Sequence, residues 1–241
     1  MSGTGNATTF RLIDGALPAK ARRWFCTNGY LHIRGAVDLP TCSRLALAYD
    51  EMLRILTDED TENIWYAPAA RGGKIIQRFN RLNFSSSIVK EFCASHPAMA
   101  AIAKGLLGDE AHFVTGEEGS EGAVMVTKDA TNIGSGSALP WHYDGYFTKH
   151  LPMNPFINAG VYLDDSDEHG GCLIVIPGSH VTFSLPEDFE GNTQTHPAEV
   201  PVVALVGDVV VHSSQLWHCS RRRTTPNGVR RVLYANYTDH R

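Results

Sequence analysis

One stretch of this chain indicates both its fold and its chemistry: Trp141-His142-Tyr143-Asp144-Gly145-Tyr146-Phe147. Side chains alternate along an extended strand, so residues two apart project from the same face and can reach one ion. His142 and Asp144 are therefore candidate metal ligands. With 11 histidines in 241 residues, however, a single His-x-Asp match carries little weight without its context.

A third ligand is available downstream of this stretch. His218 lies in the segment 214–220, and two histidines with one carboxylate on one face of an ion leave its other positions open. This arrangement suits non-haem Fe(II) oxygenases. His212, six residues before His218, is the competing histidine.

An arginine follows His218 by twelve residues on a predicted strand. The planar guanidinium of Arg230 is suited to binding a carboxylate at two points. Arg231 is the alternative, because both faces of the strand 229–237 are apolar enough to lie inside the protein. Strand periodicity alone does not choose between the two arginines.

The composition is that of an ordinary soluble domain, with 43% hydrophobic and 20% charged residues. We expect a single domain over residues 1–241, because a chain of this length can form one undivided domain with a substantial core. The net charge of −5 argues against a nucleic-acid binder, and no stretch approaches the roughly 18 apolar residues of a membrane span. The polar N-terminal segment and five scattered cysteines favour a cytoplasmic protein without a disulfide framework. We expect a monomer or a homodimer.

Helical periodicity dominates the N-terminal part, about residues 1–110. The clearest helical pattern there covers residues 40–56, with apolar residues at helical spacing and Asp38 available as an N-terminal cap. The predicted helices span residues 18–28, 40–56, 87–95 and 97–107, and two short strands span residues 30–33 and 74–79.

Beyond residue 110 the periodicity changes to short strands separated by turn residues, a density typical of a sandwich or barrel. The predicted strands span residues 111–115, 123–128, 156–163, 172–176, 200–206, 208–212 and 229–238. Helices followed by strands favour helices packed against one face of a jelly roll. We predict a mainly β fold: a double-stranded β-helix, or cupin-like jelly roll, over about residues 111–241, with N-terminal helices packed on one sheet.

Several segments together resemble the phytanoyl-CoA dioxygenase family of Fe(II)/2-oxoglutarate oxygenases. They keep the family's order and rough spacing from about residue 122 to the C-terminus. The segments are LPWHYDG at 139–145, GGCLIVIPGSH at 170–180, GDVVVH at 207–212, WHCS at 217–220 and RRVL at 230–233. The N-terminal half matches the family only in its helical character.

The resemblance implies that His142, Asp144 and His218 bind Fe(II). It selects His218 over His212, because the family places its histidine about ten to twelve residues before an arginine. His212 would then support the site from outside the ligand set or belong to the core.

The same resemblance implies the binding of a co-substrate. It selects Arg230 to hold the distal carboxylate of 2-oxoglutarate, and relatives with the same His-x-Ser pattern suggest Ser220 as a hydroxyl donor. Lys128, on the strand before the metal motif, has an open structural or co-substrate role. The basic run 221–223 is either a solvated loop or a binding site for an anionic substrate.

The N-terminal region of the family helps to shape the substrate pocket. By resemblance, possible substrate contacts there are Trp65, Gln77, Phe79 and Arg81. Around the metal motif, the aromatic residues that could line the pocket are Trp141, Tyr143, Tyr146 and Phe147.

The function that the resemblance implies is an oxygenase dependent on Fe(II), 2-oxoglutarate and O2. It would oxidise a small organic substrate, by hydroxylation above all, and release succinate and CO2. Desaturation, epoxidation and rearrangement stay open, as do acyl-CoA, amino-acid and natural-product substrates. The rival hypotheses are a cupin-like metal enzyme without 2-oxoglutarate and a non-catalytic jelly-roll binding module.

Overall fold

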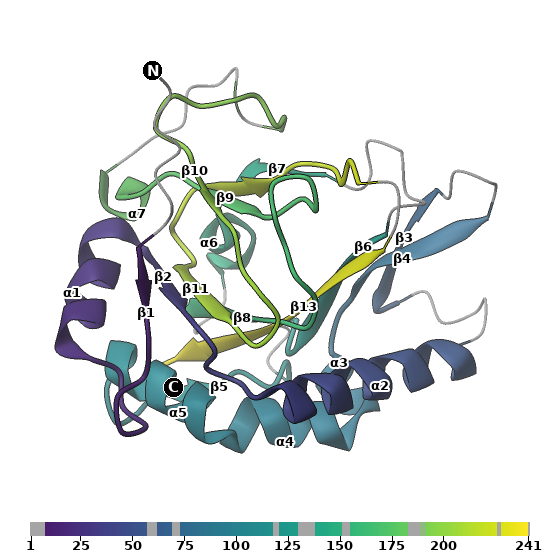
Figure 1. The fold of residues 1–241 in the computed structure, drawn as a ribbon, viewed down its shortest axis with the longest axis horizontal. Helices are drawn as coiled ribbons and strands as arrows, with labels where there is room; N and C mark the ends of the chain where they lie inside the picture. Colours follow the sequence, from purple (N-terminus) through teal and green to yellow (C-terminus); the bar gives the residue numbers. More distant parts are fainter. Residues whose placement is uncertain are drawn as a thin grey trace.

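Two β-sheets form the centre of the molecule in a computed structural model of the chain (Figure 1). The structure describes residues 8–56, 62–68, 73–117, 121–129, 138–150, 155–182, 189, 191–225 and 228–240. Helices α2, α4 and α5 run along one side of the larger sheet, and strands β7, β9 and β10 lie on its other side.

The larger sheet contains strands from both halves of the sequence. In spatial order they are β1 (Thr9–Phe10), β2 (Tyr30–Ile33), β11 (Val209–Ser213), β8 (Ile157–Tyr162), β13 (Val229–Thr238), β6 (Val124–Asp129), β4 (Lys74–Phe79) and β3 (Ile64–Pro68), with β5 (His112–Phe113) paired to β13. The smaller sheet has the order β10 (Val200–Val202), β9 (Leu173–Val175), β12 (His218–Ser220) and β7 (Leu139–His142).

The helices cover the outer face of the larger sheet. They are α1 (Ala19–Asn28), α2 (Leu39–Ile55), α3 (Leu82–Ser85), α4 (Ser87–Ser95) and α5 (Pro97–Leu107), followed by the short α6 (Asp144–Thr148) and α7 (Ser179–Thr182) near the smaller sheet. Helix α2 begins as expected, because the Asp38 side chain accepts a hydrogen bond from the Thr41 amide at 2.8 Å.

Alternation along the strands divides the interior into two apolar layers. On β13, Leu233 and Ala235 pack toward the helices, while Val232 packs toward the smaller sheet. Strand β11 does the same with Val209 and Val210. The even-numbered face of β13 therefore points into the jelly roll, which is the side from which a site can be built.

The predicted fold class is confirmed, and the long helices and strands lie within a few residues of their predicted bounds. The two strands predicted in the N-terminal region are present as β2 and β4, and they join the larger sheet, where β2 pairs with β11 and β4 pairs with β6. Strand β12 was not predicted, since three residues are too short for a periodicity to appear. Among the described residues, none of the helices is long and apolar enough to cross a membrane.

Candidate active site

The two histidines of the predicted triad are cross-strand neighbours. His142 ends β7 and His218 begins β12, and the antiparallel register places them directly opposite each other. Side chains in such a pair stand on the same face of the sheet. Their ring centroids are 4.2 Å apart, so the pairing alone brings together two ligands that are 76 positions apart in the chain.

Asp144 reaches the histidines from a different element than expected. The strand ends at His142, and Asp144 is the first residue of α6; Tyr143 between them is extended, which keeps Asp144 on the face of His142. The helix is fixed by the Gly145 amide, which donates to the Ser214 carbonyl at 2.7 Å. A Cβ at Gly145 would clash with Nε2 of Gln215 and lie 3.1 Å from the Ser214 carbonyl oxygen, so glycine favours this close approach.

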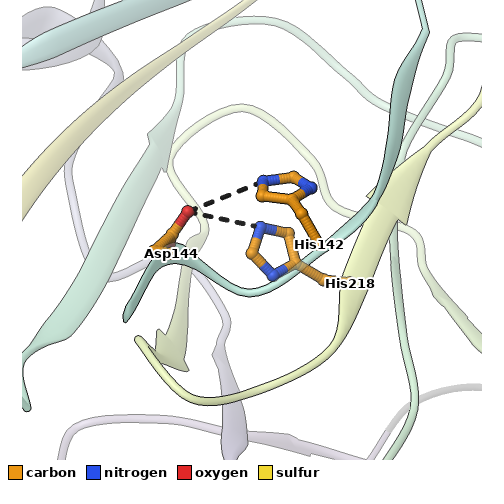
Figure 2. Close-up of side chains that lie close together, drawn as sticks. All are labelled: His142, Asp144 and His218. Atoms are coloured by element: carbon orange, nitrogen blue, oxygen red, sulfur yellow. Dashed lines mark ion pairs between the residues drawn. The ribbon is translucent and has the colours of Figure 1, made fainter. Parts of the chain in front are cut away.

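The three donor atoms converge (Figure 2). The Nε2 atoms of His142 and His218 lie 3.6 Å and 3.8 Å from Oδ1 of Asp144, and all three ligand atoms fall within 4.8 Å of one another. Donor atoms this close suit a single cation between them. The set of two imidazoles and one carboxylate is the one that non-haem iron prefers.

Both imidazoles are held with Nε2 facing the site. Nδ1 of His142 bonds the Pro140 carbonyl at 2.6 Å, and Nδ1 of His218 bonds the Leu216 carbonyl at 2.9 Å. A proton on Nδ1 leaves the Nε2 lone pair free for a metal. Burial, together with the nearby His142 and His212, lowers the pKa of His218 well below its usual value, which favours the neutral ligand form.

The second oxygen of Asp144 is also occupied. Oδ2 accepts a hydrogen bond from Nε2 of His212 at 3.1 Å and another from the side-chain Nδ2 of Asn158 at 3.3 Å. Burial by itself would raise the pKa of Asp144, but His218, His142 and His212 hold it well below its usual range. The carboxylate is therefore ionised and oriented, with Oδ1 toward His142 and His218.

A cavity of about 680 Å³ opens from the triad. Arg230 and Ser220 both line it and are almost completely buried, at 1% and 3% exposure. The Nε of Arg230 and the Oγ of Ser220 have no hydrogen-bond partner among the residues that the structure describes. Buried polar groups without partners are costly, and here they point to an anionic ligand that would satisfy both.

Arg231 has a different environment, on the opposite face of β13. Its guanidinium binds Asp164 at 2.9 Å and Asp50 at 3.1 Å, so its bonding capacity is used within the fold. Lys128 is buried between the sheets, where its amine donates to the carbonyls of Ser220 and Arg221. Burial, followed by the proximity of Arg230, lowers the pKa of Lys128 well below its usual value.

The predicted substrate contacts divide into two groups. Trp141 and Tyr146 line the cavity, as do Trp65, Tyr143 and Phe147, whereas Gln77, Phe79 and Arg81 do not belong to its lining. The reason is strand parity on β4: Phe79 is 4% exposed in the core beneath the helices, and Gln77 shares its face. Arg81 lies after the strand, at the start of α3.

Sequence reasoning missed several residues that line the cavity. They are Arg78, Glu121, Asn158, Tyr234 and Asn236. Tyr234 and Asn236 share the face of Arg230 on β13, so the parity of that strand could have found them. Arg221, within the basic run, is bound by Glu199 at 2.8 Å and is not available for an anionic substrate.

A jelly roll that presents two histidines and one carboxylate at the end of a cavity, beside a buried arginine, defines the class of Fe(II)/2-oxoglutarate-dependent oxygenases. The family model described as Phytanoyl-CoA dioxygenase (PhyH) matches residues 25–232. The chain belongs to the phytanoyl-CoA dioxygenase family, and it is an Fe(II)- and 2-oxoglutarate-dependent dioxygenase, as predicted.

Known proteins of this kind are similar along most of the chain. The peroxisomal phytanoyl-CoA dioxygenase of Rattus norvegicus is 24% identical over 95% of this chain and 70% of its own length. The structure of EctD from S. alaskensis with 2-oxoglutarate and 5-hydroxyectoine has a TM-score of 0.71 and 21% identity, covering 94% of this chain and 78% of EctD. The epimerase SnoN, solved with Fe3+, alpha ketoglutarate and nogalamycin RO, has a TM-score of 0.69 and 19% identity, covering 91% and 82%.

Proposed function

We propose that this chain hydroxylates a small organic molecule, with His142, Asp144 and His218 as the iron ligands and Arg230, assisted by Ser220, as the binding group for 2-oxoglutarate. The observation that carries the proposal is the buried, unpartnered Nε of Arg230 in the same cavity as the triad. Bound iron supplies the activation of O2 that is coupled to decarboxylation of 2-oxoglutarate to succinate.

The residues of the chain would each perform a simple task in this reaction. The backbone carbonyls of Pro140 and Leu216 hold the imidazoles in the ligating tautomer. Arg230 would neutralise the distal carboxylate of the co-substrate, and its burial would make that contact strong because water does not compete. A retained carboxylate at Asp144 supports oxygen transfer, because it fills the ligand position that halogenating relatives leave open.

The test measures the three components separately. Protein reconstituted with Fe(II) without oxygen should retain one iron per chain and bind 2-oxoglutarate in calorimetry, more tightly with iron than without it. Under isotopically labelled O2, succinate should acquire one labelled oxygen atom. Iron retention without any binding of 2-oxoglutarate would show that the proposed role of Arg230 is wrong.

Three broader expectations belong to the same proposal. We propose that residues 1–241 form one domain, supported by the pairing of β2 with β11 and β4 with β6. A cytoplasmic location is supported by five free cysteines, of which Cys26 is exposed. We expect a monomer or a homodimer, which light scattering of the loaded enzyme tests. We expect no nucleic-acid or membrane partner, which cell fractionation tests.

A further inference from the structure

The charged residues that line the cavity indicate which charge the substrate can carry. Among the described lining residues, Arg78 and Arg230 are the only arginines, and the lining includes no lysine. In the proposed function Arg230 is engaged by 2-oxoglutarate. Of the lining that the structure describes, Arg78 is therefore the one permanent cation left to meet the substrate.

Arg78 is already neutralised. Its guanidinium forms an ion pair with Glu121, its Nε donates to Oδ1 of Asn80 at 2.7 Å, and it stacks on the ring of Trp65 at 5.0 Å. Arg78 and Glu121 both belong to the cavity lining, with side chains 20% and 40% exposed. An anionic substrate would have to compete with Glu121 for this guanidinium.

The charge of Glu121 interacts electrostatically with two residues of the triad, Asp144 and His142. Burial raises its pKa; Arg78 then lowers it, Asp144 raises it and His142 lowers it. With Asp144 engaged by the metal, a negative charge on the substrate would still be repelled by Glu121. The ion pair can nevertheless donate a hydrogen bond to, and accept one from, a neutral hydroxyl or carbonyl compound.

Three aromatic side chains remain exposed around the same cavity. Trp65 is 50% exposed, Tyr146 is 50% exposed and Phe147 is 62% exposed, although all three line the cavity. Large apolar side chains left open to water around one cavity mark a binding surface for an apolar ligand. Besides the paired Arg78 over Trp65, the Lys149 amine lies 5.1 Å from the Tyr146 ring centroid, and it is outside the described lining.

We infer that the substrate is an uncharged, ring-bearing small molecule whose apolar body packs against Trp65, Tyr146 and Phe147 and whose hydroxyl or carbonyl group bonds the Arg78–Glu121 pair. The inference rests on the proposed function, because it assigns Arg230 to the co-substrate. It separates this chain from relatives named for an acyl-CoA, since the described lining offers no unpaired cation for the phosphates of CoA once Arg230 holds 2-oxoglutarate. A volume of about 680 Å³ suits a small ligand beside the co-substrate.

The experiment measures binding without turnover. Enzyme loaded with Fe(II) and 2-oxoglutarate is kept free of oxygen and titrated calorimetrically with matched probes that share one ring system. The uncharged probes are 2-naphthol and 2-decalone; the anionic ones are 2-naphthyl phosphate, 2-naphthoate and 2-naphthoyl-CoA. We expect the uncharged probes to bind and each anionic probe to bind at least roughly 10-fold more weakly, the effect of about one unfavourable charge contact.

Variants locate the binding to the proposed residues. The double change Arg78→Met with Glu121→Gln removes the pair without leaving an unpaired charge, and it should weaken 2-naphthol binding by roughly 10-fold to 100-fold, as expected for a hydrogen bond to a charged group. Trp65→Ala should weaken it by roughly 5-fold to 10-fold. Lys74→Met is the matched control, because Lys74 lies on the same strand and over the Tyr66 ring, but outside the cavity lining.

The outcomes keep this inference distinct from the proposed function. Tight binding of the phosphate or CoA probe, no binding of either uncharged probe, or equal losses in the Lys74→Met control would each overturn the substrate class while leaving iron and 2-oxoglutarate binding intact. Loss of 2-oxoglutarate binding in the unmodified enzyme would instead count against the proposed function. Folding of each variant is checked by its melting temperature.

Discussion

The imidazole of His212 holds the carboxylate of Asp144 through one hydrogen bond of 3.1 Å between Nε2 and Oδ2, across 68 residues of sequence. The same carboxylate turns Oδ1 toward His142 and His218. His212 thus contacts the triad without joining it. In the proposed site, its contribution would be to the orientation of a ligand.

This relationship predicts different results for two neighbouring histidines. His218→Ala should abolish iron retention, because a ligand is removed, and with it succinate formation. The His212→Ala variant should still bind iron, but its affinity for iron should be roughly 10-fold to 100-fold lower, the usual effect of removing a residue that orients a ligand. Metal analysis after dialysis against graded chelator measures both. Loss of iron from His212→Ala alone would contradict the assignment.

The two adjacent arginines on β13 should also differ. Arg230→Ala should raise the concentration of 2-oxoglutarate needed for half-maximal binding by at least roughly 30-fold, because a buried charged partner is lost. Arg231→Ala should leave 2-oxoglutarate binding unchanged and lower the melting temperature, since it breaks the ion pairs with Asp164 and Asp50. Calorimetry and thermal melting test the pair, and equal effects on co-substrate binding would refute the choice of Arg230.

Ser220→Ala should produce a smaller effect in the same direction. A neutral hydroxyl contributes about 1 kcal/mol, so the loss of 2-oxoglutarate affinity should be roughly 5-fold. Because the Oγ of Ser220 has no hydrogen-bond partner in the described part of the chain, its removal should not lower the melting temperature of the co-substrate-free enzyme. A drop in that temperature without any change in affinity would assign Ser220 to the fold instead.

Gly145→Ala should damage the iron site without touching a ligand. A Cβ at this position would clash with Nε2 of Gln215 and lie 3.1 Å from the Ser214 carbonyl oxygen, so Gln215 must move and the contact between the start of α6, with Asp144, and Ser214 must widen slightly. We expect weaker iron binding with an intact fold, measured by metal content and circular dichroism. Gly191→Ala is the control, because its Cβ would meet nothing within 4 Å, although its positive φ adds a small strain.

The lowered pKa of Asp208 predicts that the stability of the protein depends on pH. Burial would raise its pKa, but hydrogen bonds from His32 and the amides of Leu205 and Gly35 lower it below the usual value. A depressed folded-state pKa stabilises the protein above the unfolded pKa of about 3.9, and this stability is lost as the pH falls through the folded value. Asp208→Asn should therefore lower the melting temperature at pH 7, with a difference that shrinks below about pH 4. A difference independent of pH would argue against this linkage.

Much of the site could be predicted from the sequence because ligand spacing is a local property. His142 and Asp144 are two residues apart, and one extended residue between them is enough to align them. The pairing of His142 with His218 is a long-range register, and only the family resemblance indicated it. Periodicity left Arg230 and Arg231 equivalent, because both faces of β13 are buried, one by helices and one by the smaller sheet.

The substrate side could not be predicted for a related reason. On β4, Arg78 lies on one face of the strand, and Gln77 and Phe79 lie on the other. The alternation of Lys74–Phe79 does not indicate which of these faces lines the cavity. The answer depends on the pairing of Arg78 with Val126 on β6, which belongs to the folded sheet and not to the segment itself. Glu121 was overlooked because it precedes a strand, in a turn-rich loop.

The place of β2 in the sheet has a consequence for how the chain is made. All of its residues are buried, and they pair with Val209–His212 on β11, so that the His32–Asp208 contact spans 176 residues. A ribosome therefore releases this apolar strand long before its partner exists. Contacts of such high sequence separation slow folding and leave unpaired strand edges exposed in the meantime. The order of synthesis thus leaves β2 without its β11 partner until most of the chain has been made.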